Sequence, residues 1–198
     1  MTMPSTLANL AAKKLILGSN SPRRQELLRG LGLEFEVRVH PIEENLPADL
    51  HAQYAAAYLS KLKADLFPDQ LQADEILITA DTVVIDGGKV LGKPANEREA
   101  FEMLKSLSGT THTVMTAVTL KDLKTSVTLE DETQVTFRFL EEDEIWYYLN
   151  QYQPYDKAGS YGIQEWIGFV GVSSIQGSYF TVMGFPMHLV YSQLKKWV

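Results

Sequence analysis

Short β-branched runs alternate along this chain with longer stretches of helical spacing, a pattern that predicts strands separated by helices. Ile76-Leu77-Ile78 is typical of a buried strand, and it leads into Ala80-Asp81-Thr82. Asp86-Gly87-Gly88 lies between two apolar runs and supplies the positive φ angles of a hairpin turn. The elements predicted up to residue 91 are strands at 14–18, 35–39, 76–78, 83–85 and 89–91, and helices at 22–30 and from Pro47 to about Phe67.

The second half of the chain continues this alternation. Asn96 and Glu99 have the spacing of a capping box for a helix that runs to Leu107 and stops at Gly109. The other predicted elements are strands at 112–120, 126–139, 167–175 and 179–183, and helices at 141–151 and 187–197. Helices and strands that alternate among several hairpins indicate a mixed α/β sheet rather than a purely parallel one.

The composition is that of an acidic globular protein. The 198 residues carry a net charge of -7 without a basic block, which argues against binding to a nucleic acid polymer or an anionic membrane. The absence of cysteine excludes disulfides, thiolate metal ligands and cysteine nucleophiles. No apolar run is long enough for a transmembrane helix, and the start lacks a secretion signal, so we expect a cytoplasmic protein. No linker interrupts the chain, so one domain over 1–198 is expected, with residues 1–12 as an N-terminal tail.

The segment Ser21-Pro22-Arg23-Arg24 predicts an anion-binding site. Ser21 suits an N-cap and Pro22 suits the first helical position. A helix N-terminus presents free N–H groups and a partial positive charge, so two arginines there favour a bound anion. In an acidic protein this indicates a small phosphorylated ligand rather than a polymer. The alternative is a capped surface helix with two solvated arginines.

A carboxylate and a lysine could act on such a ligand. Asp81 follows the strand predicted at 76–78, and carboxylates at strand ends line the ligand crevice of α/β sheets. Asp81 could equally begin a turn. Lys93 lies just beyond the hairpin, where a bend could return its ammonium toward Asp81, although surface lysines are common.

Two further pairs of charged residues are candidates. Glu43 and Glu44 resemble ligands of a hard cation, or they belong to a charged loop. Lys61 and Lys63 face different directions on one predicted helix, and we expect Lys63 to point inward.

The segment from Asp156 to Gln164 is rich in small residues, which allow close approach of the backbone to a ligand. Gln164 offers a donor and an acceptor, as reading the amide edge of a base requires. The alternative is a glycine-rich turn with a solvent-facing amide. Walker, GxGxxG, GxSxG and HExxH motifs are absent, and the histidines lack metal-ligand spacing, so the chain carries no kinase, Rossmann dehydrogenase, serine hydrolase or zinc protease signature.

Taken together, these segments resemble the Maf family of nucleoside triphosphate pyrophosphatases. The resemblance runs from Leu15 almost to the C-terminus. It implies a mixed twisted sheet flanked by helices, with two lobes around a deep cleft, similar to the fold of the inosine triphosphate pyrophosphatases. The matching segments are Gly18-Ser19-Asn20-Ser21-Pro22-Arg23-Arg24-Gln25-Glu26-Leu27-Leu28, Ala80-Asp81-Thr82-Val83-Val84, Leu91-Gly92-Lys93-Pro94, Leu107-Ser108-Gly109 with His112, Asp156-Lys157-Ala158-Gly159-Ser160-Tyr161-Gly162-Ile163-Gln164 and Gly177-Ser178-Tyr179.

The resemblance implies a role for individual residues. Asp81 takes the position of the general base, and Arg23, Thr82 and Gln164 match positions linked to base selectivity in the dTTP/UTP-preferring branch. The polar cleft positions of the family fall on Ser19, Arg24, Glu43, Lys63 and Lys93. Glu165 departs from the pattern, because the family usually has glycine after the glutamine.

The chemistry expected from this resemblance is cleavage between the α- and β-phosphates of a nucleoside triphosphate. Asp81 would accept a proton from the attacking water directly or act through a divalent metal ion, Mg²⁺ or Mn²⁺, near Asp81 and Glu43. Lys63, Lys93 and the two arginines would neutralise developing charge. A homodimer is expected from the family. Two rivals are a noncatalytic nucleotide-binding regulator that acts through a protein partner and a general phosphatase that releases orthophosphate.

Overall fold

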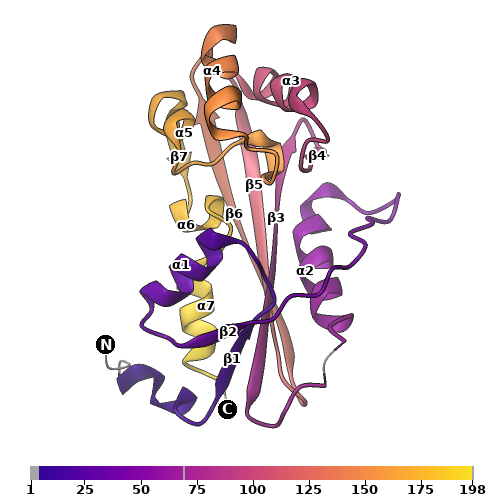
Figure 1. The fold of residues 1–198 in the computed structure, drawn as a ribbon, viewed down its shortest axis with the longest axis vertical. Helices are drawn as coiled ribbons and strands as arrows, with labels where there is room; N and C mark the ends of the chain where they lie inside the picture. The colour runs from indigo at the N-terminus through magenta and orange to yellow at the C-terminus, as the bar shows by residue number, and fades with distance from the viewer. Residues whose placement is uncertain (1–4, 69, 198) are drawn as a thin grey trace.

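The computed structural model describes residues 5–68 and 70–197, and within them a seven-stranded mixed sheet forms the centre of the molecule (Figure 1). The strand order is β2-β1-β3-β5-β6-β7, and β4 pairs with β3. β1 is parallel to β2 and β3, whereas the other pairs are antiparallel, so the predicted mixed sheet is confirmed. The strands are β1 Lys14–Leu17, β2 Phe35–Val37, β3 Glu75–Asp86, β4 Lys89–Leu91, β5 Thr111–Lys121, β6 Ser126–Phe137 and β7 Val172–Gln176.

Helices flank both faces of the sheet. α2 packs against β3 and β5 on one face, and α6 packs against β5 and β6 on the other (Figure 1). The α-helices are α1 Pro22–Gly30, α2 Ala55–Asp65, α3 Glu97–Leu107, α4 Glu142–Tyr152, α5 Trp166–Gly171, α6 Tyr179–Val182 and α7 Met187–Leu194, and the 3-10 helices are η1 Ser5–Leu10, η2 Ala52–Tyr54 and η3 Ala158–Ser160.

The predicted α1 and its cap are confirmed. Pro22 occupies the start of the helix, and the Ser21 hydroxyl accepts a hydrogen bond from the Arg24 N–H. The β3–β4 hairpin also matches its sequence signature, because Gly87 and Gly88 have φ angles of 53° and 79°. The elements that these local patterns predict, α1 and the β3–β4 hairpin, carry residues that line the pocket described below.

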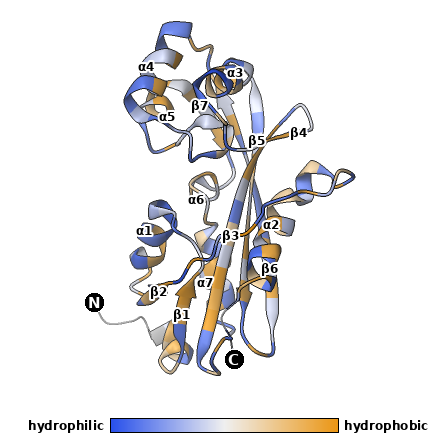
Figure 2. Cartoon of the chain, turned by 45° about the vertical axis from the view of Figure 1, so that its right-hand side comes forward, coloured by the Kyte–Doolittle hydropathy of each residue, from blue (hydrophilic) through white to orange (hydrophobic). Residues whose placement is uncertain are grey.

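Two large hydrophobic clusters lie at opposite ends of the sheet. One joins Leu28 of α1 and Val190 of α7 to β1 and the first half of β3, which Figure 2 shows as the most hydrophobic strands. The other joins α3 and α4 to Val84 and Phe137. The long strands β3, β5 and β6 connect the two ends.

The segment expected to be an N-terminal tail contains η1, which packs on the first of these clusters. Leu7 and Leu10 are buried there. The Asn9 side chain donates hydrogen bonds of 2.8 Å to the carbonyls of Leu194 and Trp197 near the C-terminus. Residues 1–4 lie outside the described part of the chain.

The helix predicted from Pro47 to about Phe67 starts later than its sequence indicates. η2 begins at Ala52 and α2 at Ala55. His51 has extended backbone angles, and its Nδ1 accepts a hydrogen bond from the Gln53 N–H, so it caps the helical segment. The helical segment therefore begins after this local cap at His51, and residues 47–51 lie outside it despite their composition.

Of two strands predicted near the C-terminus, the one at 167–175 is wrong in part and the one at 179–183 is wrong. Residues 166–171 form α5 before β7 begins, and residues 179–182 form α6. Short apolar runs do not distinguish a strand from a buried helix by periodicity. The backbone of Ile163 approaches α5 so closely that only glycine fits at position 168, where a Cβ would lie 1.9 Å from the Ile163 carbonyl oxygen.

We predict that Asn96→Ala lowers the free energy of unfolding by about 1 kcal/mol, because the Asn96 side chain caps α3 by accepting the Glu99 N–H. Urea denaturation measures the change. Glu102→Ala, on the exposed face of the same helix, serves as the control and should stay within about 0.5 kcal/mol of wild type. Equal effects of the two substitutions would contradict the capping role.

Candidate active site

A pocket of about 740 Å³ lies between the two hydrophobic clusters and collects most of the predicted site residues. The pocket is lined by the loop after β1, the start of α1, α2, the middle of β3, the segment after β4 and the loop around η3. Eight predicted residues line it: Ser19, Arg23, Arg24, Lys63, Asp81, Thr82, Lys93 and Gln164. The ninth, Glu43, is not among the lining residues.

Asp81 lies in the middle of a strand, which differs from the strand end predicted for it. β3 continues to Asp86, and Asp81 pairs with Ala117 of β5. On the other side, β1 pairs with β3 as far as Ile78, and β4 pairs with it from Val84. Among the described residues, the stretch between Ile78 and Val84 therefore has no strand neighbour on this edge.

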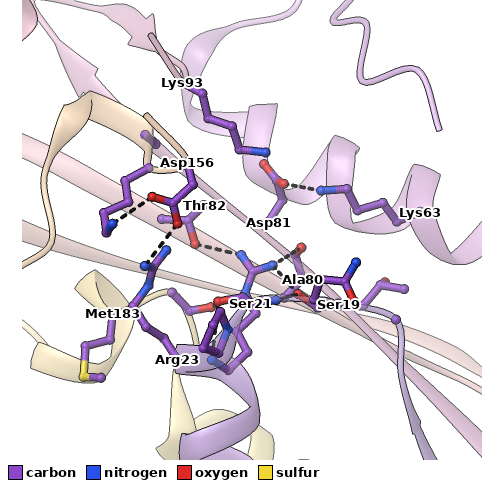
Figure 3. A pocket seen from close by; sticks show the side chains of 18 of the residues that line it. Ser19, Ser21, Arg23, Lys63, Ala80, Asp81, Thr82, Lys93, Asp156 and Met183 are labelled. Atoms are coloured by element: carbon purple, nitrogen blue, oxygen red, sulfur yellow. Dashed lines mark hydrogen bonds and ion pairs between the residues drawn. The ribbon is translucent and has the colours of Figure 1, made fainter. Parts of the chain in front are cut away.

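This gap lets both faces of β3 contribute to one pocket, because successive side chains of a strand point to opposite faces. Asp81 points toward α2, where its Oδ1 lies 2.5 Å from the Nζ of Lys63. Thr82 points toward α1, where its Oγ1 accepts a hydrogen bond of 3.2 Å from Arg24 Nη2. Figure 3 shows the two side chains extending in these different directions.

The Lys63 ammonium joins two carboxylates. Its Nζ lies 2.5 Å from Asp81 and 3.1 Å from Glu44 Oε1. Burial alone would raise the pKa of Glu44, but the charge and hydrogen bond of Lys63, with the charges of Lys93 and Arg24, lower it overall. The Lys93 side chain also points toward Asp81 (Figure 3). The pocket thus brings carboxylates and several cations together.

The structure brings Glu44 to the pocket in place of Glu43. Glu43 is exposed, and its carboxylate accepts a hydrogen bond from the Asn45 side chain. The sequence pattern identified both glutamates but offered no signal for which would face inward, because they lie in an irregular segment without strand or helix periodicity.

The pair Asp81 and Glu44 has the donor chemistry of a divalent cation site that uses substrate oxygens as well. Within residues 5–68 and 70–197, no three His, Asp or Glu side chains are grouped closely enough to hold a metal by themselves. Mg²⁺ is commonly held by one or two carboxylates together with phosphate oxygens. The carboxylates present therefore fit a metal that binds along with a triphosphate.

Arg24 is half-buried and connects the segments at the base of the pocket. Its Nη1 donates to Ser19 Oγ at 3.2 Å and to the Ala80 carbonyl at 2.9 Å, and its Nε donates to the Gly184 carbonyl at 2.9 Å. With the bond to Thr82, four of the five guanidinium donors have protein acceptors. Burial lowers the pKa of Arg24, and the charges of the two pocket carboxylates oppose that shift. A phosphate contact by Arg24 stays a prediction.

Arg23 and Gln164 lie on the other side of the pocket. Arg23 Nη1 is 3.5 Å from Asp156 Oδ2 (Figure 3). The Gln164 Oε1 atom is buried, and no hydrogen-bond partner for it is found among the described residues. A buried acceptor without a partner is costly in the absence of a ligand, so Gln164 is well suited to accept a hydrogen bond from one.

Comparisons with known proteins identify the family of this chain. Residues 14–197 match the sequence model of the family described as Maf-like protein. The chain belongs to the Maf family. Proteins named dTTP/UTP pyrophosphatase from Bacteroides fragilis and Phocaeicola vulgatus are 49% and 51% identical over 191 residues, which cover 96% of this chain and 99% of each relative. This Maf chain thus aligns with essentially the whole length of these relatives.

Solved structures give a weaker comparison. A nucleoside-triphosphatase / dITP/XTP pyrophosphatase from Mycobacterium abscessus is 15% identical, with a TM-score of 0.37, over 63% of this chain and 74% of its own. The Staphylococcus aureus Ham1 protein is 11% identical, with a TM-score of 0.35, over 63% of this chain and 72% of its own. The family assignment therefore rests on sequence, and the fold description rests on the sheet itself.

We predict that Arg24→Lys lowers the free energy of unfolding of this Maf protein by about 2–4 kcal/mol, because a lysine ammonium cannot reach all four acceptors from one position. Urea denaturation tests the prediction, with Arg29→Lys as the control on the exposed side of the same helix. A loss no larger than that of the control would show that the four hydrogen bonds do not stabilise the fold.

Proposed function

We propose that this Maf protein is a nucleoside triphosphate pyrophosphatase that hydrolyses dTTP and UTP to the nucleoside monophosphate and pyrophosphate. The observation that carries the proposal is the convergence of Asp81, Lys63 and Lys93 at the open edge of β3. The names of the relatives at about half identity support the same activity.

Asp81 is proposed as the general base. Its side chain is only 11% exposed, yet it lines the pocket, so a water held there would be within reach of the carboxylate and shielded from bulk solvent. Lys63 holds the carboxylate in place through the 2.5 Å contact. A proton taken from the water at the α-phosphorus would pass to Asp81 as the bond to the pyrophosphate breaks.

The cations of the pocket would neutralise the triphosphate. Lys63 and Lys93 lie on the Asp81 side, and Arg23 lies at the start of α1, whose N-terminal N–H groups also favour anions. Charge builds up on the leaving pyrophosphate in the transition state, and preorganised cations stabilise it there. The resemblance assigns the same task to Arg24, whose remaining Nη2 donor is the group available for it.

A divalent metal, Mg²⁺ or Mn²⁺, is proposed as the cofactor. Asp81 and Glu44 are the carboxylates of the pocket that would hold it, with Glu44 in the place that the sequence suggested for Glu43. When bound, such an ion supplies Lewis-acid stabilisation of phosphate oxygens. The homodimer that the family resemblance implies and the cytoplasmic location expected from the sequence both stay predictions. No described helix is long and apolar enough to cross a membrane.

The products distinguish this proposal from its two rivals. A pyrophosphatase converts UTP to UMP and pyrophosphate, a general phosphatase forms UDP and orthophosphate, and a noncatalytic regulator forms nothing. Chromatography of the nucleotide, together with separate assays for the two inorganic products in the presence of Mg²⁺ or Mn²⁺, reports all three outcomes.

Asp81→Asn should lower turnover of UTP on the order of 10²–10⁴-fold while the protein still folds and binds nucleotide, because the change removes the proton acceptor but keeps the side-chain shape. Steady-state kinetics and a nucleotide titration measure the two effects. Asp86→Asn, at the far end of the same strand, is the matched control. Turnover within about threefold of wild type would rule out Asp81 as the base.

Wild-type kcat/KM should be higher for dTTP and UTP than for ATP and GTP. Uracil and thymine present two carbonyl acceptors around one N–H donor, which Arg23, Thr82 and the buried oxygen of Gln164 can match. Adenine would leave a buried group without a partner, which costs about 1–3 kcal/mol. Gln164→Ala should therefore narrow the difference between UTP and ATP. A wild-type preference for a purine would contradict this account of the base pocket and leave the pyrophosphatase proposal standing.

A further inference from the structure

The loop from Gly162 to Glu165, which carries Gln164, is held at both ends by one buried hydroxyl. The Tyr148 OH on α4 accepts a hydrogen bond of 3.0 Å from the Gly162 N–H. The same hydroxyl donates to Glu165 Oε2. Burial and the neighbouring Glu165 raise the pKa of Tyr148, so the hydroxyl stays protonated and remains a donor. Tyr148 therefore fixes the backbone on one side of Gln164 and the side chain on the other.

Glu165 also connects this loop to the arginine at the start of α1. Its Oε1 lies 3.2 Å from the Nζ of Lys157, which in turn contacts Asp156 Oδ1 at 2.7 Å. Asp156 reaches Arg23 through its second oxygen. The four charges alternate in sign, and the Lys157 and Glu165 side chains are only 9% and 18% exposed. Such buried pairs depend on one another, because removal of one partner leaves an uncompensated charge.

Gly162 shows how closely this arrangement is packed around Gln164. A Cβ at Gly162 would lie 2.7 Å from Glu165 Cδ and 3.0 Å from Gln164 Nε2. The φ angle of Gly162 lies outside the left-handed region, so a side chain at this position would be opposed by its contacts with Glu165 and Gln164 rather than by backbone conformation. The Glu165 carboxylate and the Gln164 amide therefore both pack against the Gly162 backbone, where no side chain separates them, and a shift of one would move the other.

We propose that Tyr148 and Glu165 are positioning residues for base selection, which hold the Gln164 amide in the orientation that favours a pyrimidine. The inference rests on the proposed base pocket and extends it to residues that do not line that pocket. Neither residue would touch the phosphates, which are assigned to the cations around Asp81. Loss of the anchor should therefore change discrimination between bases more than it changes the chemical step.

Tyr148→Phe is the direct test, because it keeps the buried ring and removes both hydrogen bonds to the loop. We expect kcat/KM for UTP to fall about five- to tenfold, chiefly through KM, while the value for ATP changes less than about twofold. Tyr147→Phe is the matched control: it removes the hydroxyl of the neighbouring, half-exposed tyrosine and should leave the UTP/ATP ratio unchanged.

Glu165→Gln gives a second, independent measurement. The amide oxygen can still accept from Tyr148, but the charge facing Lys157 is lost, so the fall in the UTP/ATP ratio should be smaller than in Tyr148→Phe. Circular dichroism and thermal unfolding show whether Tyr148→Phe folds. If it does not, the UTP/ATP ratio of kcat/KM for Glu165→Gln tests the positioning role by itself.

The outcomes separate this inference from the proposed function. A wild-type preference for UTP that both variants retain, or an equal fall for UTP and ATP, would overturn the positioning role and leave the function intact. A wild-type enzyme without a preference for UTP would overturn the proposed base pocket and the positioning role together. The positioning role is supported if the ratio of kcat/KM for UTP to that for ATP falls in both variants and stays unchanged in Tyr147→Phe.

Discussion

The pocket depends on the hydrogen bonds of the Arg24 guanidinium, because they join segments that are far apart in the sequence. Its hydrogen bonds reach the backbone of Ala80 on β3 and of Gly184 after α6. Removing a cation from water is costly unless acceptors and opposite charges replace the solvent. The acceptors are supplied by these carbonyls and two hydroxyls, and the opposite charge by Asp81 and Glu44, which oppose the effect of burial on the pKa of Arg24.

Arg24 contacts β3 at the stretch between Ile78 and Val84, where the strand has no β-strand neighbour on one edge in the described part of the chain and the pocket forms. Because β1 ends before Asp81 and β4 begins after it, the strand exposes an edge from which both of its faces are reached. Asp81 and Lys63 occupy one face, and Thr82 and Arg24 the other. The loop of Gln164 is held separately, by α4. The proposed base recognition thus depends on α4, which holds the Gln164 loop, as well as on Arg24, which hydrogen-bonds to Thr82.

Features that depend on local backbone chemistry were predicted from the sequence. The cap of α1 at Ser21, the cap of α3 at Asn96 and the hairpin turn at Gly87 each match a short pattern of residue types. The mixed sheet was predicted from the alternation of helices, strands and hairpins along the chain. Eight of the nine candidate site residues also line one pocket, and the motifs that carry them lie within the residues that match the family model.

The sequence by itself therefore determined most of the elements, the family and most of the site's residue types, since these follow from local propensity and motif. Only the tertiary structure decided that Asp81 lies within a strand, that Glu44 rather than Glu43 reaches the pocket, and that Tyr148 and Glu165 anchor the Gln164 loop. The reason is physical: each of these depends on contacts between residues far apart in the chain, where packing and the satisfaction of buried polar groups outweigh local preference.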